Sequence, residues 1–126
     1  MNAAPVRPCI AVVDDDDSVR EALLALLAVL GFDARPFASA RAFLDAGAAS
    51  RADCLLVDVM MPGMSGPQLM RQPPVRARGI PVVFITGMHD EVARRDLLAL
   101  GAVDCLFKPF GEAQLLRALR AALRRN

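Results

Sequence analysis

The sequence lacks any hydrophobic run long enough to cross a membrane. Its longest, ALLALLAVLGF, falls well short of the roughly 18 apolar residues that a membrane helix needs. The N-terminal segment, MNAAPVRPCIAVVDDDD, reaches four acidic residues after only a short apolar run, so it does not resemble a secretory signal. We therefore expect a cytoplasmic protein with no membrane partner.

A net charge of one sign is also missing, since 15 Lys and Arg residues oppose 14 Asp and Glu residues and the formal charge is +1. This balance supplies no overall attraction to nucleic acid or anionic lipid, so the functional electrostatics must be local. The cysteines are few, odd in number and set in apolar runs: Cys9, Cys54 and Cys105. We interpret them as buried, reduced thiols, in preference to a redox site.

What the sequence does contain is enough apolar material for one core. It has 126 residues, of which 55% are hydrophobic, and this length is typical of a single domain. It shows no internal repeat, low-complexity tract or linker. We expect one domain over residues 1–126, with no effector domain.

Short apolar runs with β-branched residues alternate with helix-forming segments. Such runs indicate strands buried on both faces of a parallel sheet, at 9–13, 54–57, 81–85 and 103–107. The segment 32–37 is a weaker candidate, because Pro36 restricts it to a sheet edge. This order, strand then helix five times over, predicts an α/β fold with a doubly wound parallel sheet.

The helix boundaries carry their own signals. Ser18 and Glu21 have the spacing of a capping box, and Ser39 has the position of a helix cap. The Pro73-Pro74 pair predicts that the third helix is short and broken near Gln72. The helices are expected from Ser18 to before Gly31, from Ser39 to about Gly47, from about Gly66, over about 90–100, and from about Glu112.

Polar side chains follow four of the predicted strands, at the end where parallel sheets bind ligands. Asp14 and Asp15 follow the first strand, Asp58 the third, Thr86 the fourth and Lys108 the fifth. Hard oxygen ligands of this kind suit Mg²⁺, which takes one or two protein carboxylates and retains water or phosphate oxygens. We therefore predict a Mg²⁺ site at this edge.

The same arrangement suits phosphoryl transfer. An aspartate is a competent nucleophile toward phosphorus and forms an aspartyl phosphate. The cation, Lys108 and Thr86 would stabilise the oxygens of the transferred group by charge and hydrogen bonding. This chemistry accounts for the concentration of acid after the first strand.

Four blocks in order, VVDDD, LLVDVMMPGMSG, VVFITG and GAVDCLFKPF, make the chain resemble the receiver domains of bacterial two-component response regulators over essentially its full length. It is most similar to those of nitrogen-fixation (FixJ-like) transcriptional regulators. The resemblance implies a flavodoxin-like (βα)5 fold with strand order 2-1-3-4-5. It also implies Asp58 as phosphoacceptor, and Asp14, Asp15 and the backbone carbonyl of Met60 as further Mg²⁺ ligands, with Asp15 the firmer direct ligand of the acidic pair.

The resemblance also implies a mechanism for the site and the partners of the domain. Thr86 would move to hydrogen-bond the phosphoryl group, Lys108 would pair with it, and the Lys108-Pro109 bond would be cis. The phosphodonor would be a sensor histidine kinase, with self-phosphorylation from small donors, and the domain would not be a turnover enzyme. A homodimer or effector contact would use the helices over about 90–100 and from 112. Separately, the sequence shows no nucleic-acid recognition element, so we expect no direct nucleic-acid binding.

The chain departs from the family at several positions. Cys105 replaces the usual Tyr or Phe, so we expect Thr86 and the segment around Met88 to move without a ring, although Phe107 shares the strand face of Cys105. Met60 and Met88 occupy positions that tune hydrolysis in the family. Neither thioether orients water well, so we predict a long-lived aspartyl phosphate.

Two other functions stay open. A phosphorylation-independent interaction module is favoured only by Cys105. A Mg²⁺-dependent phosphohydrolase is disfavoured because Met60 stands where such enzymes usually keep a second Asp. The chain is either a stand-alone receiver or part of a longer transcription factor.

The remaining polar residues have plainer interpretations. His89 is expected to be an exposed residue at a helix start. Asp16 and Asp17 are expected to be acids that complement the start of the first helix. Arg117, Arg120 and Arg124 are expected to be solvent-facing charges, with partner docking as the alternative.

Overall fold

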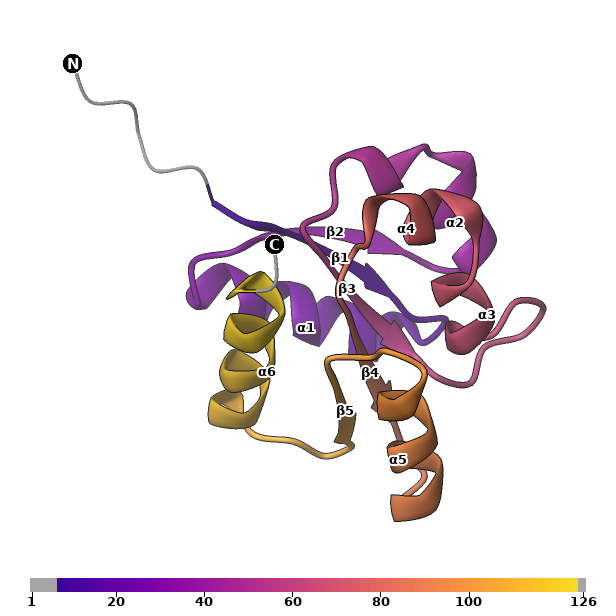
Figure 1. Cartoon of the computed structure of the whole chain (residues 1–126). Coiled ribbons are helices and arrows are strands. Elements are labelled where there is room, and N and C mark those ends of the chain that lie inside the picture. The colour runs from indigo at the N-terminus through magenta and orange to yellow at the C-terminus, as the bar shows by residue number, and fades with distance from the viewer. Residues whose placement is uncertain (1–6, 125–126) are drawn as a thin grey trace.

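The computed structural model describes residues 7–124, and its centre is one five-stranded parallel sheet (Figure 1). The strand order is β2-β1-β3-β4-β5, and every neighbouring pair is parallel. The strands are β1 Cys9–Val13, β2 Asp33–Phe37, β3 Cys54–Asp58, β4 Val82–Thr86 and β5 Asp104–Phe107. The predicted α/β class, strand order and edge position of the Pro36 strand are confirmed, with boundaries shifted by a residue or so.

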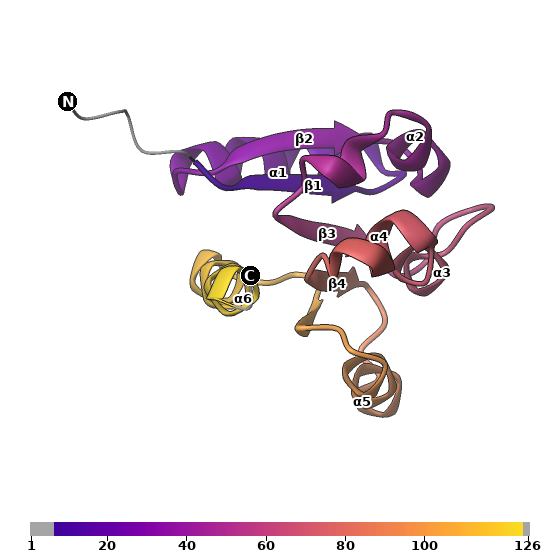
Figure 2. The same ribbon diagram turned by 45° about the horizontal axis from the view of Figure 1, so that its top comes forward.

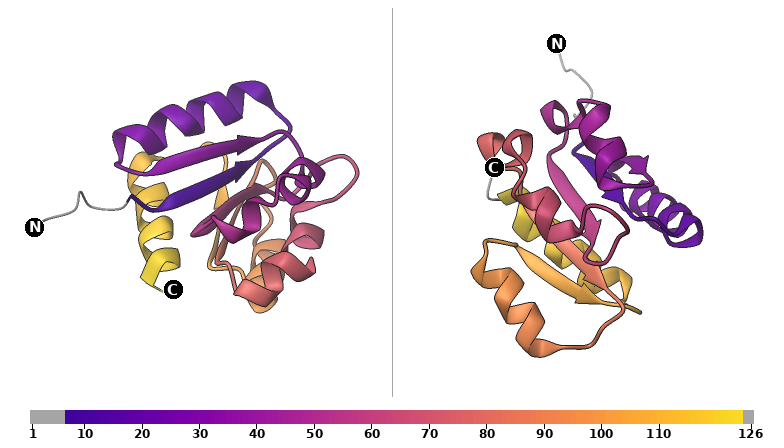
Figure 3. Two further views of the ribbon diagram at one scale, coloured as in Figure 1. Left: turned by 90° about the horizontal axis from the view of Figure 1, so that it is seen from above. Right: turned by 90° about the vertical axis from the view of Figure 1, so that its right-hand side faces the viewer.

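Within residues 7–124, five α-helices and one 3₁₀ turn connect the strands, and a sixth α-helix follows β5. They are α1 Asp17–Val29, α2 Ala40–Asp45, η1 Ala48–Ser50, α3 Gly66–Met70, α4 Pro73–Arg78, α5 Glu91–Ala99 and α6 Glu112–Arg124. In Figure 1, α1 and α6 lie to the left of the sheet, and α2, α3, α4 and α5 lie to its right. Both views in Figure 3 show helices on each side of the strands, so the sheet is the middle of three layers.

The two faces of the sheet bury separate apolar clusters, because successive strand residues point in opposite directions. Ile10, Leu56 and Ile85 pack with Leu23 of α1 and Leu119 of α6. The alternate strand residues, such as Leu55, Val57 and Phe84, pack with Phe43, Leu69 and Leu97 on the opposite side. The central strands are therefore apolar throughout, which is why they are recognisable as continuous runs.

The start of α1 differs from the prediction. Its N-cap is Asp16, whose carboxylate accepts the N–H of Val19 at 3.1 Å, and Ser18 lies inside the first turn. The Ser18–Glu21 capping box is therefore wrong, and Asp17 is the acid in the first turn. A capping box does form at α3, where Ser65 and Gln68 bond each other's backbone N–H groups.

The other helix signals are confirmed. Ser39 caps α2 through the N–H of Ala42, and the third helix is interrupted, with Gln72 as the N-cap of a separate α4. Pro73 and Pro74 occupy the first turn of α4, where the missing N–H groups have no intrahelical partner to lose. Gly79 ends α4 at φ +62°, a conformation that glycine adopts without strain.

All three cysteines are free; Cys54 and Cys105 are buried, whereas Cys9 is only half-buried. Burial raises the pKa of the Cys54 thiol to about 12, which keeps it protonated and unreactive. Between residues 7 and 124, the structure contains no helix with the length and apolar character of a membrane span. Residues 1–6, which entered the prediction that a secretory signal is absent, lie outside the described part of the chain.

Candidate functional site

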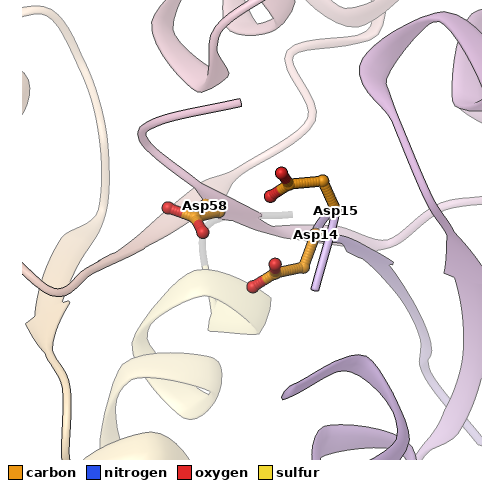
Figure 4. Close-up of side chains that lie close together, drawn as sticks. All are labelled: Asp14, Asp15 and Asp58. Atoms are coloured by element: carbon orange, nitrogen blue, oxygen red, sulfur yellow. The ribbon is translucent and has the colours of Figure 1, made fainter. Parts of the chain in front are cut away.

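Parallel pairing brings three carboxylates to one edge of the sheet. Asp14 follows β1 and Asp58 ends β3, and β1 and β3 are neighbouring strands (Figure 2). Their register places Val13 opposite Val57. One carboxylate oxygen from each of Asp14, Asp15 and Asp58 lies within 4.8 Å of the others. Figure 4 shows Asp14 and Asp15 on one segment with Asp58 across from them. The predicted acidic cluster is therefore present.

Asp14 is completely buried, and its two oxygens have different surroundings. Oδ1 accepts the N–H of Asp16 at 2.9 Å, whereas Oδ2 has no hydrogen-bond partner among the described residues. Burial raises the pKa of the Asp14 carboxyl, and the charge of Asp58 acts in the same direction. A buried, unsatisfied carboxylate oxygen beside two further carboxylates fits a hard divalent cation such as Mg²⁺.

Lys108 supplies the positive charge of the cluster. Its Nζ lies 3.3 Å from Asp58 Oδ2 and 3.6 Å from Asp14 Oδ2. Its backbone N–H donates to the carbonyl of Thr86 at 2.8 Å. The Lys108-Pro109 peptide bond is cis, as the resemblance implies. The ammonium group therefore reaches the same carboxylates as the predicted cation site.

Thr86 and Met60 also lie beside Asp58. Thr86 is the last residue of β4 and is buried, and its Oγ1 accepts the N–H of Met88 at 3.1 Å. The N–H of Met60 donates to Asp58 Oδ1 at 3.1 Å. All the predicted site residues are thus gathered at one edge of the sheet, and the metal-binding role of the Met60 carbonyl stays a prediction.

An apolar pocket of about 150 Å³ adjoins this edge and is lined by Thr86, Met88, Leu97, Cys105 and Phe107, among others. Cys105 and Phe107 both border it, as the alternation of strand β5 predicts. Whether Thr86 moves without a ring partner stays a prediction.

The sequence analysis did not identify three residues as parts of the site. Arg20 donates from Nη1 to the backbone carbonyl of Asp14 at 2.7 Å and pairs through Nη2 with Asp17. At Gly66, an added Cβ would lie 2.5 Å from the backbone oxygen of Asp58. Such an approach is closed to any residue with a side chain, so Gly66 lets α3 begin directly behind the acceptor.

His89 is the third of these residues, and its interpretation needs correction. It is exposed as expected, but α5 begins at Glu91 with Asp90 as N-cap, so His89 lies before the helix. Its ring stacks on Phe107 with a centroid distance of 5.1 Å and an interplanar angle of 16°. Its Nε2 lies 2.7 Å from the carbonyl oxygen of Lys108, so it has tertiary partners.

Comparison with known proteins adds independent observations. The family model described as "Response regulator receiver domain" matches residues 10–120. The transcriptional regulatory protein FixJ of Azorhizobium caulinodans is 42% identical over 115 residues, covering 91% of this chain and 54% of that protein. The response regulator protein TodT of Pseudomonas putida is also 42% identical over 115 residues, covering 91% of this chain and 51% of its own length. The chain thus spans about half the length of these curated relatives.

Solved structures of response regulators are also similar to this chain. The crystal structure titled FixJ-N matches with a TM-score of 0.82 and 31% identity, covering 97% of this chain and 98% of that one. The structure of the response regulator StyR matches with a TM-score of 0.84 and 41% identity, covering 96% of this chain and 61% of that one.

Proposed function

Because the chain belongs to the response regulator receiver domain family, we propose that Asp58 accepts a phosphoryl group from a sensor histidine kinase in a Mg²⁺-dependent reaction. Receiver domains are signalling domains rather than turnover enzymes, and this one switches the contacts of a partner or effector. The observation that carries the assignment is the meeting of three carboxylates, one of them with an unsatisfied buried oxygen, beside the ammonium of Lys108.

The side chains of Asp14, Asp15 and Asp58, with the carbonyl of Met60, would hold Mg²⁺. When bound, the cation neutralises the carboxylates and the oxygens of the incoming phosphoryl group. The orphaned Oδ2 of Asp14 supports this assignment, because a carboxylate oxygen without a hydrogen bond in a buried position otherwise costs free energy.

The chain's own residues supply the remaining chemistry. A carboxylate oxygen of Asp58 bonds to phosphorus as the bond from phosphorus to the donor's imidazole nitrogen breaks. The ammonium of Lys108, 3.3 Å from Asp58 Oδ2, is close enough to offset charge on the phosphoryl oxygens. Thr86 accepts a hydrogen bond from Met88, so its own hydroxyl proton remains available for donation to the new group.

The names of the relatives support a proposal for what this receiver regulates. Some of them are named as transcriptional regulators, and we propose that this receiver likewise controls an effector in the cytoplasm. A homodimer or effector contact through α5, β5 and α6 is supported by the exposed Arg117, Arg120 and Arg124, which border one pocket on α6. Their predicted exposure to solvent is confirmed.

One experiment tests the proposal against both alternatives. The protein is incubated with Mg²⁺ and acetyl phosphate, and its intact mass is followed beside an Asp58→Asn control. We expect a stable adduct of one phosphoryl group on the unsubstituted protein and none on the control. Absence of an adduct would favour a phosphorylation-independent module, and rapid release of phosphate would favour a phosphohydrolase.

A further inference from the structure

The main chain of Lys108 is fixed on both sides by one short segment, residues 86–89. Its N–H donates to the carbonyl of Thr86 at 2.8 Å. Its carbonyl oxygen lies 2.7 Å from Nε2 of His89. A carbonyl only accepts, so the ring nitrogen carries the proton in this contact. The lysine whose ammonium faces Asp58 is therefore held at both of its peptide groups.

The same imidazole is held in place by the residue before Lys108. Its ring is nearly parallel to that of Phe107, with 5.1 Å between centroids and 16° between planes. Phe107 is half-buried and borders the apolar pocket beside Thr86. His89 thus contacts two consecutive residues of the chain, one through its face and the other through its edge.

We propose that His89 is a positioning residue for Lys108, acting through the hydrogen bond to its carbonyl and the stack on Phe107. The role rests on the proposed phosphoacceptor function, because only there does the exact place of the ammonium matter. A lysine stem is long and flexible, so fixing its main chain narrows the positions that Nζ reaches. Small displacements of a charged group at a transfer site lower rates sharply.

The position of His89 also separates this role from metal binding. Its contacts are with Phe107 and Lys108, whereas the predicted Mg²⁺ ligands lie on the segments that follow β1 and β3. A loss of His89 is therefore expected to affect phosphoryl transfer more than the affinity for Mg²⁺, because His89 contacts none of the predicted ligands directly. A general loss of structure would affect both.

The sequence makes the test unusually direct, because Lys108 is its only lysine and His89 its only histidine. Labelling with lysine that carries ¹³C only at Cε gives one side-chain NMR signal, which reports on Lys108 alone. The variants are His89→Ala, His89→Phe, which keeps the ring but loses the donor, and His89→Gln, which keeps a donor but loses the ring. Val92→Ala is the matched control, because Val92 is exposed near the start of α5 and 65% accessible.

We expect His89→Ala to shift the lysine signal and to slow phosphorylation by acetyl phosphate about threefold to tenfold, the factor expected for one ordinary hydrogen bond. The Mg²⁺ dissociation constant, measured by calorimetry, should stay within about twofold of its original value. His89→Phe and His89→Gln should each recover part of the rate. Val92→Ala should change none of these quantities.

A double-mutant cycle completes the test. In a Lys108→Ala background, His89→Ala should cause no further loss of rate; an equal loss there would overturn the proposal. An unmoved lysine signal in His89→Ala would also overturn the positioning role. If the unsubstituted protein still formed the adduct, the proposed phosphoacceptor function would stand without it. If the unsubstituted protein forms no adduct while the lysine signal still responds to His89→Ala, the positioning role stands and the proposed function fails.

Discussion

At the residue scale, two methionines, Met60 and Met88, line the apolar pocket beside Thr86. They are 64% and 60% exposed, in contrast to the buried Asp58. Their thioethers are weak hydrogen-bond acceptors and do not orient water for attack on an aspartyl phosphate. The side chains of these two exposed residues are therefore apolar, whereas that of Asp15 is charged and exposed.

Replacing both methionines with glutamine should shorten the life of the phosphorylated protein. We expect decay about tenfold faster, less than the roughly 100-fold or more that a well-positioned general base contributes, because glutamine orients water without taking its proton. The measurement is the loss of the adduct mass with time after removal of the phosphodonor. Val29→Gln on α1, which is 80% exposed, is the control. An unchanged lifetime in the double variant would contradict the interpretation.

Arg20 bears on metal affinity. It holds the backbone carbonyl of Asp14 at 2.7 Å, so Arg20→Leu should loosen the segment that carries the acidic pair. We expect the Mg²⁺ dissociation constant to rise about fivefold, as for loss of one hydrogen bond worth about 1 kcal/mol. Calorimetric titration measures it.

The control for Arg20 is Asp17→Asn. This change removes only the ion pair with a largely exposed aspartate, which contributes little. Equal affinities for Mg²⁺ in the Arg20→Leu and unsubstituted proteins would show that the hydrogen bond from Arg20 to the Asp14 carbonyl is not needed for Mg²⁺ binding.

At the element scale, the start of α3 sets the position of the acceptor strand. An added Cβ at Gly66 would lie 2.5 Å from the backbone oxygen of Asp58 and 2.9 Å from the ring of Phe84. Neither atom belongs to a flexible side-chain end, so β3 and α3 must separate to make room. We expect Gly66→Ala to lower the free energy of unfolding by about 2–3 kcal/mol, as overpacking does.

Urea unfolding measures the effect of Gly66→Ala. The matched control is Gly111→Ala, where the nearest atom to the added Cβ is the Gln114 side-chain oxygen at 4.0 Å. Wild-type stability in Gly66→Ala would refute the close approach of α3 to β3.

The elements also show why some features could be predicted and others could not. The strands and the acids that follow them are local patterns, and parallel pairing then gathers those residues by rule. The cap of α1 was misassigned because four consecutive aspartates offer several oxygens, and the end of β1 decides which one faces the helix. The contact of His89 with Lys108 joins segments that follow different strands, so no local spacing reveals it. The need for glycine at position 66 follows from its close approach to the backbone oxygen of Asp58, which only the structure shows.

At the scale of the whole molecule, the acidic cluster opposes folding when no cation is bound. Asp14 is fully buried with one unsatisfied oxygen and lies beside Asp58. Asp14→Asn removes the buried charge while keeping the shape of the side chain. In chelator, we expect this variant to be more stable than the unsubstituted protein by about 1–2 kcal/mol, because burying the Asp14 charge is costly even with Lys108 Nζ 3.6 Å from its Oδ2.

Thermal and urea unfolding with and without Mg²⁺ test whether the cation offsets the cost of burying the Asp14 charge. Added Mg²⁺ should stabilise the unsubstituted protein by mass action and stabilise Asp14→Asn much less. A variant that is less stable than the original in chelator would contradict the account.

The register between β1 and β3 has a consequence for how this sequence can change length. Val13 lies opposite Val57, so Asp14 and Asp58 emerge together although 43 residues separate them along the chain. Insertions in the turns between α1 and β3 would alter that count without changing this register. A single residue inserted inside β1 or β3 would turn one carboxylate toward the opposite layer. The register therefore restricts length changes within these two short strands more than in the turns that connect them.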